Sequence, residues 1–308
     1  MKVSFIIPLH NCLPLTQAML ASLRATLPQN LAHEIILVDD DSTDGTREWL
    51  QNLAAPCRVL LNENNLGFAG ACNRGAASAT GEFLFFINND LVFQSHWLEP
   101  MLAAFARFPD AGLVGNVQLN AATGAVDHSG IFFNHQGKPA HRIDLPLSTR
   151  WFGWPAYRAV DALTGACFGL RRSVWVQFGG FDEDFVNGSE DIDLALRAAV
   201  AGFRHYIALG SVVRHHISSS AGRNLRDEQN SQRLMQRWTE RIVVLAARDW
   251  SRHFIEQHWD QSFLYDDILG RQALYCWLGL LPAVPAGVRT GVRAALAVEF
   301  ARWRRLAT

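Results

Sequence analysis

The residue whose position says most about chemistry is Asp90, which follows a largely apolar run over residues 82–87 and two amides, Asn88 and Asn89. A run of this length that stops at amide and carboxylate side chains is typical of a buried strand with oxygen atoms at its carboxyl end. Ligands bind at that edge of an open α/β sheet, and one carboxylate together with phosphates commonly holds a divalent cation there. The alternative is that Asp90 only caps a helix expected from about residue 96.

A second group of carboxylates ends the strand expected over residues 34–38. Asp39, Asp40 and Asp41 are consecutive, so each needs a partner that offsets the repulsion from the other two. One or two of them could cap the helix expected over residues 46–53. One held in a crevice could instead accept a hydrogen bond from the N3–H of a uracil or thymine ring. These residues leave both interpretations open.

A third group of acids surrounds the start of an amphipathic helix predicted over residues 191–201. Six acids fall within twelve positions, namely Asp182, Glu183, Asp184, Glu190, Asp191 and Asp193. The helix dipole stabilises an acid near a helix N-terminus by about 0.3–1 kcal/mol, so some of them need no chemical role. A carboxylate here could also act as a general base, a role that contributes roughly 10²–10⁴-fold to a rate.

Two further segments could contact phosphates. Residues 64–75 are rich in glycine but lack the Lys-Ser/Thr of a P-loop and the Gly-x-Gly-x-x-Gly of a dinucleotide fold. Their glycines are expected to let a helix start against a nucleotide, with Asn73 or Arg74 reaching toward it. His215 ends a predicted strand, where a histidine can be a surface residue or a ligand suited to Mn²⁺. Arg223 lies in the Ser- and Gly-rich stretch beyond it, which resembles a lid.

The composition describes a globular protein with a sizeable core. The chain has 308 residues, of which 49% are hydrophobic and 19% charged, and its formal net charge is −1. These values argue against a disordered or nucleic-acid-coating protein. The five cysteines are scattered without a Cys-x-x-Cys pair, so we expect no zinc or redox site and a reducing compartment. The longest apolar stretches are too short for a transmembrane helix, and residues 1–8 indicate a first strand rather than a signal peptide.

Strands and helices alternate through the first 120 residues. Strands are predicted over residues 3–8, 34–38, 58–61, 82–87 and 112–119, and helices over residues 16–26, 46–53, 68–79 and 96–108. This alternation predicts an α/β fold with a mostly parallel sheet between helices. Further strands are predicted over residues 127–133, 162–170, 203–208 and 211–214. Residues 134–157 have little periodicity and are expected to form a long loop beside a substrate site.

From about residue 225 the pattern is helical and becomes basic. The last 38 residues hold six arginines and one acid, Glu299, and their apolar stretch over residues 273–288 is broken by Pro282 and Pro285. A basic amphipathic segment of this kind can lie on an anionic membrane surface. The alternative is a helical hairpin that packs on the main domain or on a second subunit of a homodimer.

Taken in order, these motifs resemble those of family 2 glycosyltransferases of the GT-A fold. The motifs are IIPLHN (residues 6–11), VDDDSTDGT (38–46), NLGFAGACN (65–73), NND (88–90), GA (165–166), GFDE (180–183), EDIDLALR (190–197) and His215. The resemblance implies a GT-A, Rossmann-like domain over residues 1–223. Its nucleotide-binding half would span residues 1–120 and its acceptor half residues 121–223, followed by a C-terminal helical region over residues 224–308.

The resemblance also implies roles for particular residues. Asp90 and His215 would bind Mn²⁺ or Mg²⁺, and Asp191 would be the catalytic base with Glu190 beside it. The residues implied in binding the nucleotide sugar are Pro8, His10, Asn11, Asp39, Asp40, Asn65, Gly67, Asn73, Asn89, Gly165 and Arg223. Because positions 88 and 89 are asparagine, one carboxylate is left for the cation, which predicts weak metal binding without nucleotide.

The implied activity is an inverting transfer of a sugar from a UDP- or dTDP-sugar to a hydroxyl of a carbohydrate or lipid-linked glycan. It would serve bacterial surface polysaccharide or glycoconjugate synthesis, in the cytoplasm or at the inner face of its membrane, without a nucleic-acid partner. The NND and NLGF variants resemble those of rhamnosyltransferase-like members. The alternative is a non-catalytic nucleotide-sugar-binding scaffold or sensor, which would not need to retain Asp90, Asp191 and His215 together.

Overall fold

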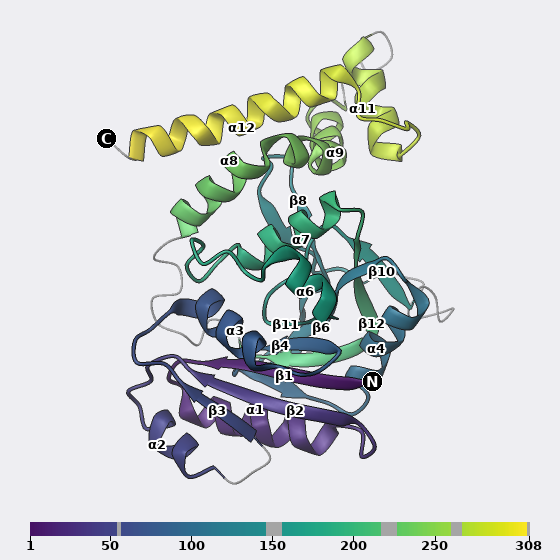
Figure 1. Ribbon diagram of the computed structural model, residues 1–308. Helices are drawn as coiled ribbons and strands as arrows, with labels where there is room; N and C mark the ends of the chain where they lie inside the picture. The colour runs from purple at the N-terminus through teal and green to yellow at the C-terminus, as the bar shows by residue number, and fades with distance from the viewer. Residues whose placement is uncertain (54–56, 146–155, 217–226, 260–266, 307–308) are drawn as a thin grey trace. The chain divides into compact units, whose positions relative to one another are not determined.

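The computed structural model describes residues 1–53, 57–145, 156–216, 227–259 and 267–306 (Figure 1). The described chain forms two compact units. The first comprises Met1–Ile131 and His141–Arg226, and the second comprises Phe132–Ala140 and Asp227–Thr308.

In the described part of the first unit, ten strands form one mixed sheet. The main path has the order β10-β12-β6-β11-β4-β1-β2-β3, while β5 pairs with β12 and β7 pairs with β6. The strands are β1 (Lys2–Leu9), β2 (Ala32–Asp39), β3 (Cys57–Leu61), β4 (Phe83–Ile87), β5 (Leu91–Phe93), β6 (Ala111–Asn120), β7 (Val126–His128), β10 (Tyr157–Val160), β11 (Cys167–Arg171) and β12 (Arg204–His215).

Helices cover both faces of this sheet, which explains why its central strands are almost continuously apolar. On one face, Phe5 and Phe85 pack against Trp97 with ring centroids 6.2 and 6.3 Å away, beneath α1 (Leu13–Thr26) and α4 (Leu98–Arg107). On the other face, Phe86 packs 4.5 Å from the ring of Trp175 in α6 (Arg172–Phe178). The same unit contains α2 (Thr46–Gln51), α3 (Gly67–Ser78) and α7 (Glu190–Val200).

The predicted fold class, an α/β fold with a mostly parallel sheet, flanking helices and a helical C-terminal region, is confirmed. The parallel direction is wrong for β11, which lies antiparallel to both β4 and β6 in the middle of the sheet. A buried strand has the same apolar sequence in either direction, so the pattern could not reveal this. The two strands predicted over residues 203–214 form the single strand β12, and β5, β10 and α6 were not predicted.

The second unit combines helices with a hairpin from the middle of the chain. Its helices are α8 (Asp227–Leu245), α9 (Ala247–His258), α11 (Ile268–Leu278) and α12 (Ala286–Leu306), and its hairpin is formed by β8 (Ile131–Phe133) and β9 (Pro139–His141). The hairpin turn is held by the N–H of His135, 2.8 Å from Asp249 Oδ2, and by Lys138 Nζ, 2.9 Å from Glu299 Oε2.

One expectation for these regions changes. The long loop predicted from residue 134 is wrong for residues 134–141, because this stretch folds back as the turn and second strand of the hairpin. Among the helices that the structure describes, none combines the length and apolar character needed to cross a bilayer.

Candidate active site

The carboxyl ends of three parallel strands place polar side chains at one edge of the first unit's sheet. β1 pairs in parallel with both β2 and β4, so His10, Asp40 and Asn88 each follow a strand end at the same edge. Asn89 strengthens this edge: its Nδ2 donates to the carbonyl of Asn11 at 3.2 Å and to Thr16 Oγ1 at 3.0 Å.

Asp90 and His215 lie side by side where β5 pairs with β12. Leu91 is in register with His215, and the N–H of His216 donates to the carbonyl of Asp90 at 2.9 Å. This backbone ladder sets His215 Nε2 3.3 Å from Asp90 Oδ1, with the two side chains only 6% and 8% exposed. Neither ring nitrogen of His215 makes a hydrogen bond within the described structure, which is unusual for a buried imidazole.

This pair has the donor chemistry of a Mn²⁺ or Mg²⁺ site. A carboxylate oxygen is a hard ligand for either ion, and imidazole suits Mn²⁺ in particular. An ion bound between Asp90 and His215 would also give the buried Nε2, which makes no hydrogen bond among the described residues, a ligand bond. In the part of the chain that the structure describes, no group of three His, Cys, Asp or Glu side chains could hold an ion. The two side chains fit a site whose remaining ligands come from phosphates and water.

Asp191 reaches the same edge through two successive hydrogen bonds. Its Oδ2 accepts the N–H of Gly165 at 2.5 Å, and the carbonyl of the next residue, Ala166, accepts the N–H of Asn88 at 2.8 Å. Gly165 permits this approach, because a Cβ there would lie 3.3 Å from Asp191 Oδ2. The structure therefore brings Asp90, His215 and Asp191 to the carboxyl end of β4.

The other acids around α7 hold the turn before the helix. Glu190 is 5% exposed, and its Oε2 accepts the N–H of Gly188 at 2.7 Å. Asp193 is fully buried, and its Oδ2 accepts from Arg197 Nε at 2.7 Å, while Arg197 Nη2 donates to the carbonyl of Gly180 at 2.8 Å. Of the three acids in the first turn of α7, Asp191 is the half-buried one, so its fixed carboxylate keeps access to solvent.

The three consecutive carboxylates at the end of β2 have different hydrogen-bond and ion-pair partners. Asp40 Oδ1 accepts from Asn62 Nδ2 at 2.6 Å and from the N–H of Leu66 at 2.9 Å. Asp39 is fully buried, and its Oδ2 accepts from Arg47 Nε at 2.8 Å. Arg47 Nη2 also lies 4.0 Å from Asp41 Oδ1, so one guanidinium offsets the charge of two neighbours.

None of these three acids caps the following helix. Asp44 has that role, since its Oδ1 accepts from the N–H and the hydroxyl of Thr46 at 3.1 and 2.6 Å. Burial would raise the pKa of Asp44, but these hydrogen bonds and one from the N–H of Leu13 outweigh it and lower the pKa.

Four further residues were implied in binding the nucleotide sugar, namely His10, Asn65, Pro8 and Gly67. His10 and Asn65 are exposed, with His10 Nδ1 3.2 Å from Asn65 Nδ2 and 2.8 Å from the carbonyl of Asp40. Pro8 is a half-buried residue of β1, and Gly67 has a φ of +74° with its N–H donating to Asn65 Oδ1 at 2.9 Å.

Asn73 faces the GFDE turn. Its Oδ1 accepts the N–H of Phe181 at 3.0 Å, and its Nδ2 donates to the carbonyl of Phe181 at 3.0 Å and to Glu183 Oε1 at 2.8 Å. In the described structure its amide therefore holds α3 to residues 181–183. Arg223 lies outside the described residues.

One residue at this edge, Asp127, was not predicted from the sequence to belong to the site. Asp127 Oδ2, on β7, lies 3.6 Å from His215 Nδ1. Beside it, His128 is 1% exposed, and burial, followed by the nearby His141 and His215, places its pKa well below the usual value. The sequence offered only a short strand beginning near residue 127, and nothing linked it to His215.

A family model described as Glycosyl transferase family 2 matches residues 4–174. The chain belongs to this family. It is 32% identical over 227 residues to the O-antigen biosynthesis protein RfbC of Myxococcus xanthus, covering 71% of this chain and 18% of that protein. It is 28% identical over 211 residues to the N-acetylglucosaminyl-diphospho-decaprenol L-rhamnosyltransferase of Mycobacterium tuberculosis, covering 62% and 68%. The chain thus spans less than a fifth of the length of RfbC.

The fold agrees with this family. The crystal structure of GalNAc-T7 with UDP, GalNAc and Mn²⁺ superposes with a TM-score of 0.64 at 17% identity, over 87% of this chain and 53% of that one. At this identity the likeness supports the fold alone, which is GT-A. The predicted family and fold are both confirmed: the chain is a family 2 glycosyltransferase.

Proposed function

We propose that this glycosyltransferase inverts the anomeric configuration as it transfers a sugar from a UDP- or dTDP-sugar to a hydroxyl of a carbohydrate or lipid-linked glycan. The observation that carries the proposal is the position of Asp191. A half-buried carboxylate, fixed by Gly165, lies at the sheet edge that also holds the buried pair Asp90 and His215. A base and a diphosphate site at one edge are what a single in-line displacement needs.

The donor would bind along the carboxyl ends of β1, β2 and β4. Asp39 or Asp40 accepts the N3–H of the uracil or thymine ring, and the exposed His10 and Asn65 lie beside them. Asp90 and His215 would hold Mn²⁺ or Mg²⁺, which when bound would offset the charge of the departing diphosphate.

Asp191 then takes the proton from the acceptor hydroxyl. Its Oδ1 accepts the N–H of Ile192 at 2.7 Å and its Oδ2 that of Gly165, so the carboxylate is held in one orientation. As the proton passes to the carboxylate, the acceptor oxygen bonds to the anomeric carbon and the bond to the diphosphate breaks on the opposite face. One displacement of this kind inverts the anomeric centre.

The two bacterial relatives support a surface-glycan role. One is named for O-antigen biosynthesis and the other as an L-rhamnosyltransferase acting on a decaprenol-linked sugar. The second name favours a lipid-linked acceptor for this chain.

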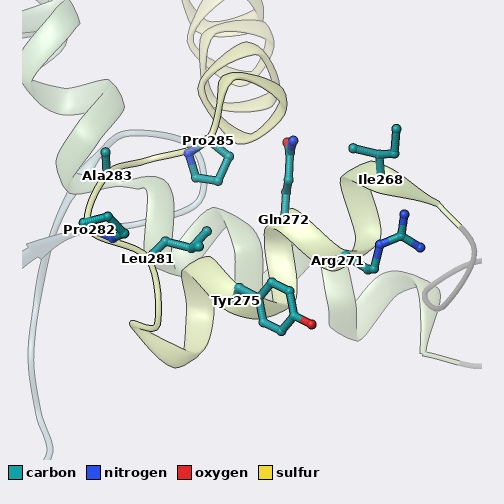
Figure 2. A pocket seen from close by; sticks show the side chains of 8 residues that line it. All are labelled: Ile268, Arg271, Gln272, Tyr275, Leu281, Pro282, Ala283 and Pro285. Atoms are coloured by element: carbon teal, nitrogen blue, oxygen red, sulfur yellow. The ribbon is translucent and has the colours of Figure 1, made fainter.

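We also propose that the second unit makes peripheral contact with an anionic membrane, where such an acceptor would lie. A pocket of about 420 Å³ lies between α11 and the turn before α12. Figure 2 shows the side chains that line it, most of which are apolar. Leu278 at the end of α11 is 49% exposed, and Leu280 and Leu281 in this turn are 65% and 36% exposed. No acid occurs between Asp267 and Glu299 in the sequence, which suits a negatively charged lipid surface.

A thermal-shift screen with UDP, dTDP and GDP, each with and without Mn²⁺, tests the donor and metal assignments together. UDP or dTDP with Mn²⁺ is expected to raise the melting temperature, because a ligand at 100 times its Kd adds about 2.7 kcal/mol of stability. A rise in melting temperature with GDP but with neither UDP nor dTDP would overturn the donor assignment. Rises that are the same with and without Mn²⁺ would overturn the metal site.

A further inference from the structure

We infer that Asp127 is a positioning residue for His215, and that it determines which ring nitrogen of His215 faces Asp90 and the bound cation. This inference rests on the proposed function, because it concerns how the same site holds its ion. It adds to the site a carboxylate that touches neither ion nor substrate but fixes the side chain that does.

Asp127 lies at an irregularity in the pairing of β6 with β7. Gln118 pairs with His128 and Leu119 pairs with Val126, so Asp127 is an extra residue in the ladder. An inserted residue of this kind bends a strand and re-aims its side chain, and such bulges are frequent next to active sites.

The bulge sits across β6 from His215. Leu119 of β6 is in register with Arg214 of β12, and Asn120 is in register with His215, so β12 and β7 flank the same stretch of β6. Two side chains from the outer strands of such a trio are normally too far apart to touch. At Asp127 the irregularity changes this, since Asp127 Oδ2 lies 3.6 Å from His215 Nδ1.

The imidazole of His215 therefore lies between two carboxylates. Nδ1 faces Asp127, whose side chain is 25% exposed, and Nε2 faces Asp90, whose side chain is 8% exposed. The 3.6 Å separation is longer than a hydrogen bond and is within reach of a small rotation of the Asp127 side chain. A proton kept on Nδ1 by Asp127 leaves the lone pair of Nε2 directed toward Asp90.

This arrangement matches a general requirement of metal-binding histidines. Such a histidine usually donates its second N–H to a carboxylate or carbonyl, which fixes the tautomer and the ring orientation. His128 does not supply this contact, because its Nε2 accepts the N–H of Gly130 at 3.2 Å and its Nδ1 makes no hydrogen bond within the described part of the chain. Asp127 is the carboxylate that lies at the right nitrogen.

Calorimetric titration of Mn²⁺ into the UDP-saturated protein tests this role. Asp127→Ala is expected to weaken Mn²⁺ binding by about 10–100-fold. Asp127→Asn should weaken it less, because the amide oxygen still accepts from Nδ1–H and the side chain keeps its size. Asp144→Asn is the matched control, since it removes an exposed carboxylate of the same unit that pairs with Arg158 instead.

A second readout follows the ring of His215 itself, without metal. Nitrogen chemical shifts of the histidine rings, with the His215 signal identified by its loss in His215→Gln, should report the Nδ1–H tautomer in the wild type and in Asp127→Asn. Asp127→Ala should shift the population toward Nε2–H. A purely structural role would lower the melting temperature without moving this signal.

The outcomes separate this inference from the proposed function. If the wild type binds Mn²⁺ with UDP and Asp127→Ala binds it equally well, the positioning role is wrong while the metal site stands. If Asp144→Asn weakens binding as much as Asp127→Asn, overall charge and not position explains the effect, and the inference is overturned. If the wild type binds no Mn²⁺ with any nucleoside diphosphate, the metal site itself is wrong.

Discussion

The two units use buried and charged groups differently. In the first unit, buried polar atoms that make no hydrogen bond within the described structure gather near the end of β4, among them Asn88 Oδ1 and both ring nitrogens of His215. In the second unit, the exposed Glu228 and Glu240 pair with arginine side chains, and the buried Glu299 pairs with both Arg302 and Lys138. Unsatisfied buried groups cost stability, so their concentration at one edge indicates where a ligand completes the structure.

The sharpest test of this contrast is Asp191→Asn. The amide keeps the shape of the side chain but cannot take a proton, so turnover should fall by about 10²–10⁴-fold. Nucleotide binding should stay unchanged, since Asp191 is held by Gly165 and not by the nucleotide-side acids. Release of nucleoside diphosphate from the donor and a thermal shift with UDP measure the two properties.

The exposed Asp184 of the same acidic turn gives a matched control. Asp184→Asn changes the net charge of the turn by the same amount as Asp191→Asn. It should keep wild-type turnover, because Asp184 is not the proposed base. Retained turnover in Asp191→Asn would instead favour the non-catalytic scaffold or assign the base to another residue.

Arginine substitutions compare the two units directly through stability. Arg47→Met removes the cation from Asp39, which is fully buried, and should lower the free energy of unfolding by about 3 kcal/mol or more. Arg302→Met in the second unit breaks pairs with Glu228, which is exposed, and with Glu299, which keeps Lys138 as a partner 2.9 Å away, so the loss should be about 1 kcal/mol or less. Urea unfolding of the full chain measures both losses of stability. Equal losses would show that the ion pair of Asp39 contributes no more than the pairs of Arg302.

Asp90→Asn should act on the same edge without disturbing the fold. The amide is a poor cation ligand, so Mn²⁺-dependent binding of UDP should weaken by about tenfold or more. Binding of UDP in the presence of a chelator should be the same for the variant and the wild type. A variant that loses the chelator-resistant part as well would show that Asp90 contacts the nucleotide instead.

The second unit's apolar turn is tested with vesicles. The wild type should float with vesicles that contain phosphatidylglycerol, and the double change Leu280→Ser with Leu281→Ser should reduce partitioning by at least about tenfold, since two leucines leave the lipid. Val176→Ser with Val200→Ser is the control, because those side chains are 67% and 66% exposed in the first unit.

Two other results would redirect this interpretation. Equal binding of wild type and variant would exclude the turn as the membrane contact. A double variant whose mass by light scattering drops from a dimer to a monomer would show that a second copy of the chain covers these leucines.

The sequence predicted the parts of the molecule that depend on local pattern. The apolar run before Asp90 and the amphipathic helix at Asp191 could be recognised because each signal lies within one segment. The contact of Asp127 with His215 could not, since it arises from a bulge that shifts the register of two strands. The return strand of the hairpin, over residues 139–141, was missed for a related reason, because a strand of three residues gives no period to detect.

The last comparison concerns pH, through one acid in each unit. Burial alone would raise the pKa of Glu34 from 4.5, but hydrogen bonds from Ser4 and Thr80, together with the charge of Lys2, outweigh it and hold the pKa at about 2. A depressed pKa adds stability that is present in full above the unfolded value and is lost as pH falls through the folded one. Glu34 should therefore stabilise the protein above about pH 4.5 and lose this contribution between about pH 4.5 and 2.

Urea unfolding from pH 6 down to pH 2.5 checks this window. The deficit of Glu34→Gln relative to wild type should be largest near neutral pH and shrink as the pH approaches 2.5, whereas a constant deficit would mean that shape and not charge explains it. In the second unit, a hydrogen bond from Arg293 is the main cause that lowers the pKa of Glu240, which is exposed. Salt screens exposed charges, so Glu240→Gln should show a smaller pH effect that disappears at high ionic strength.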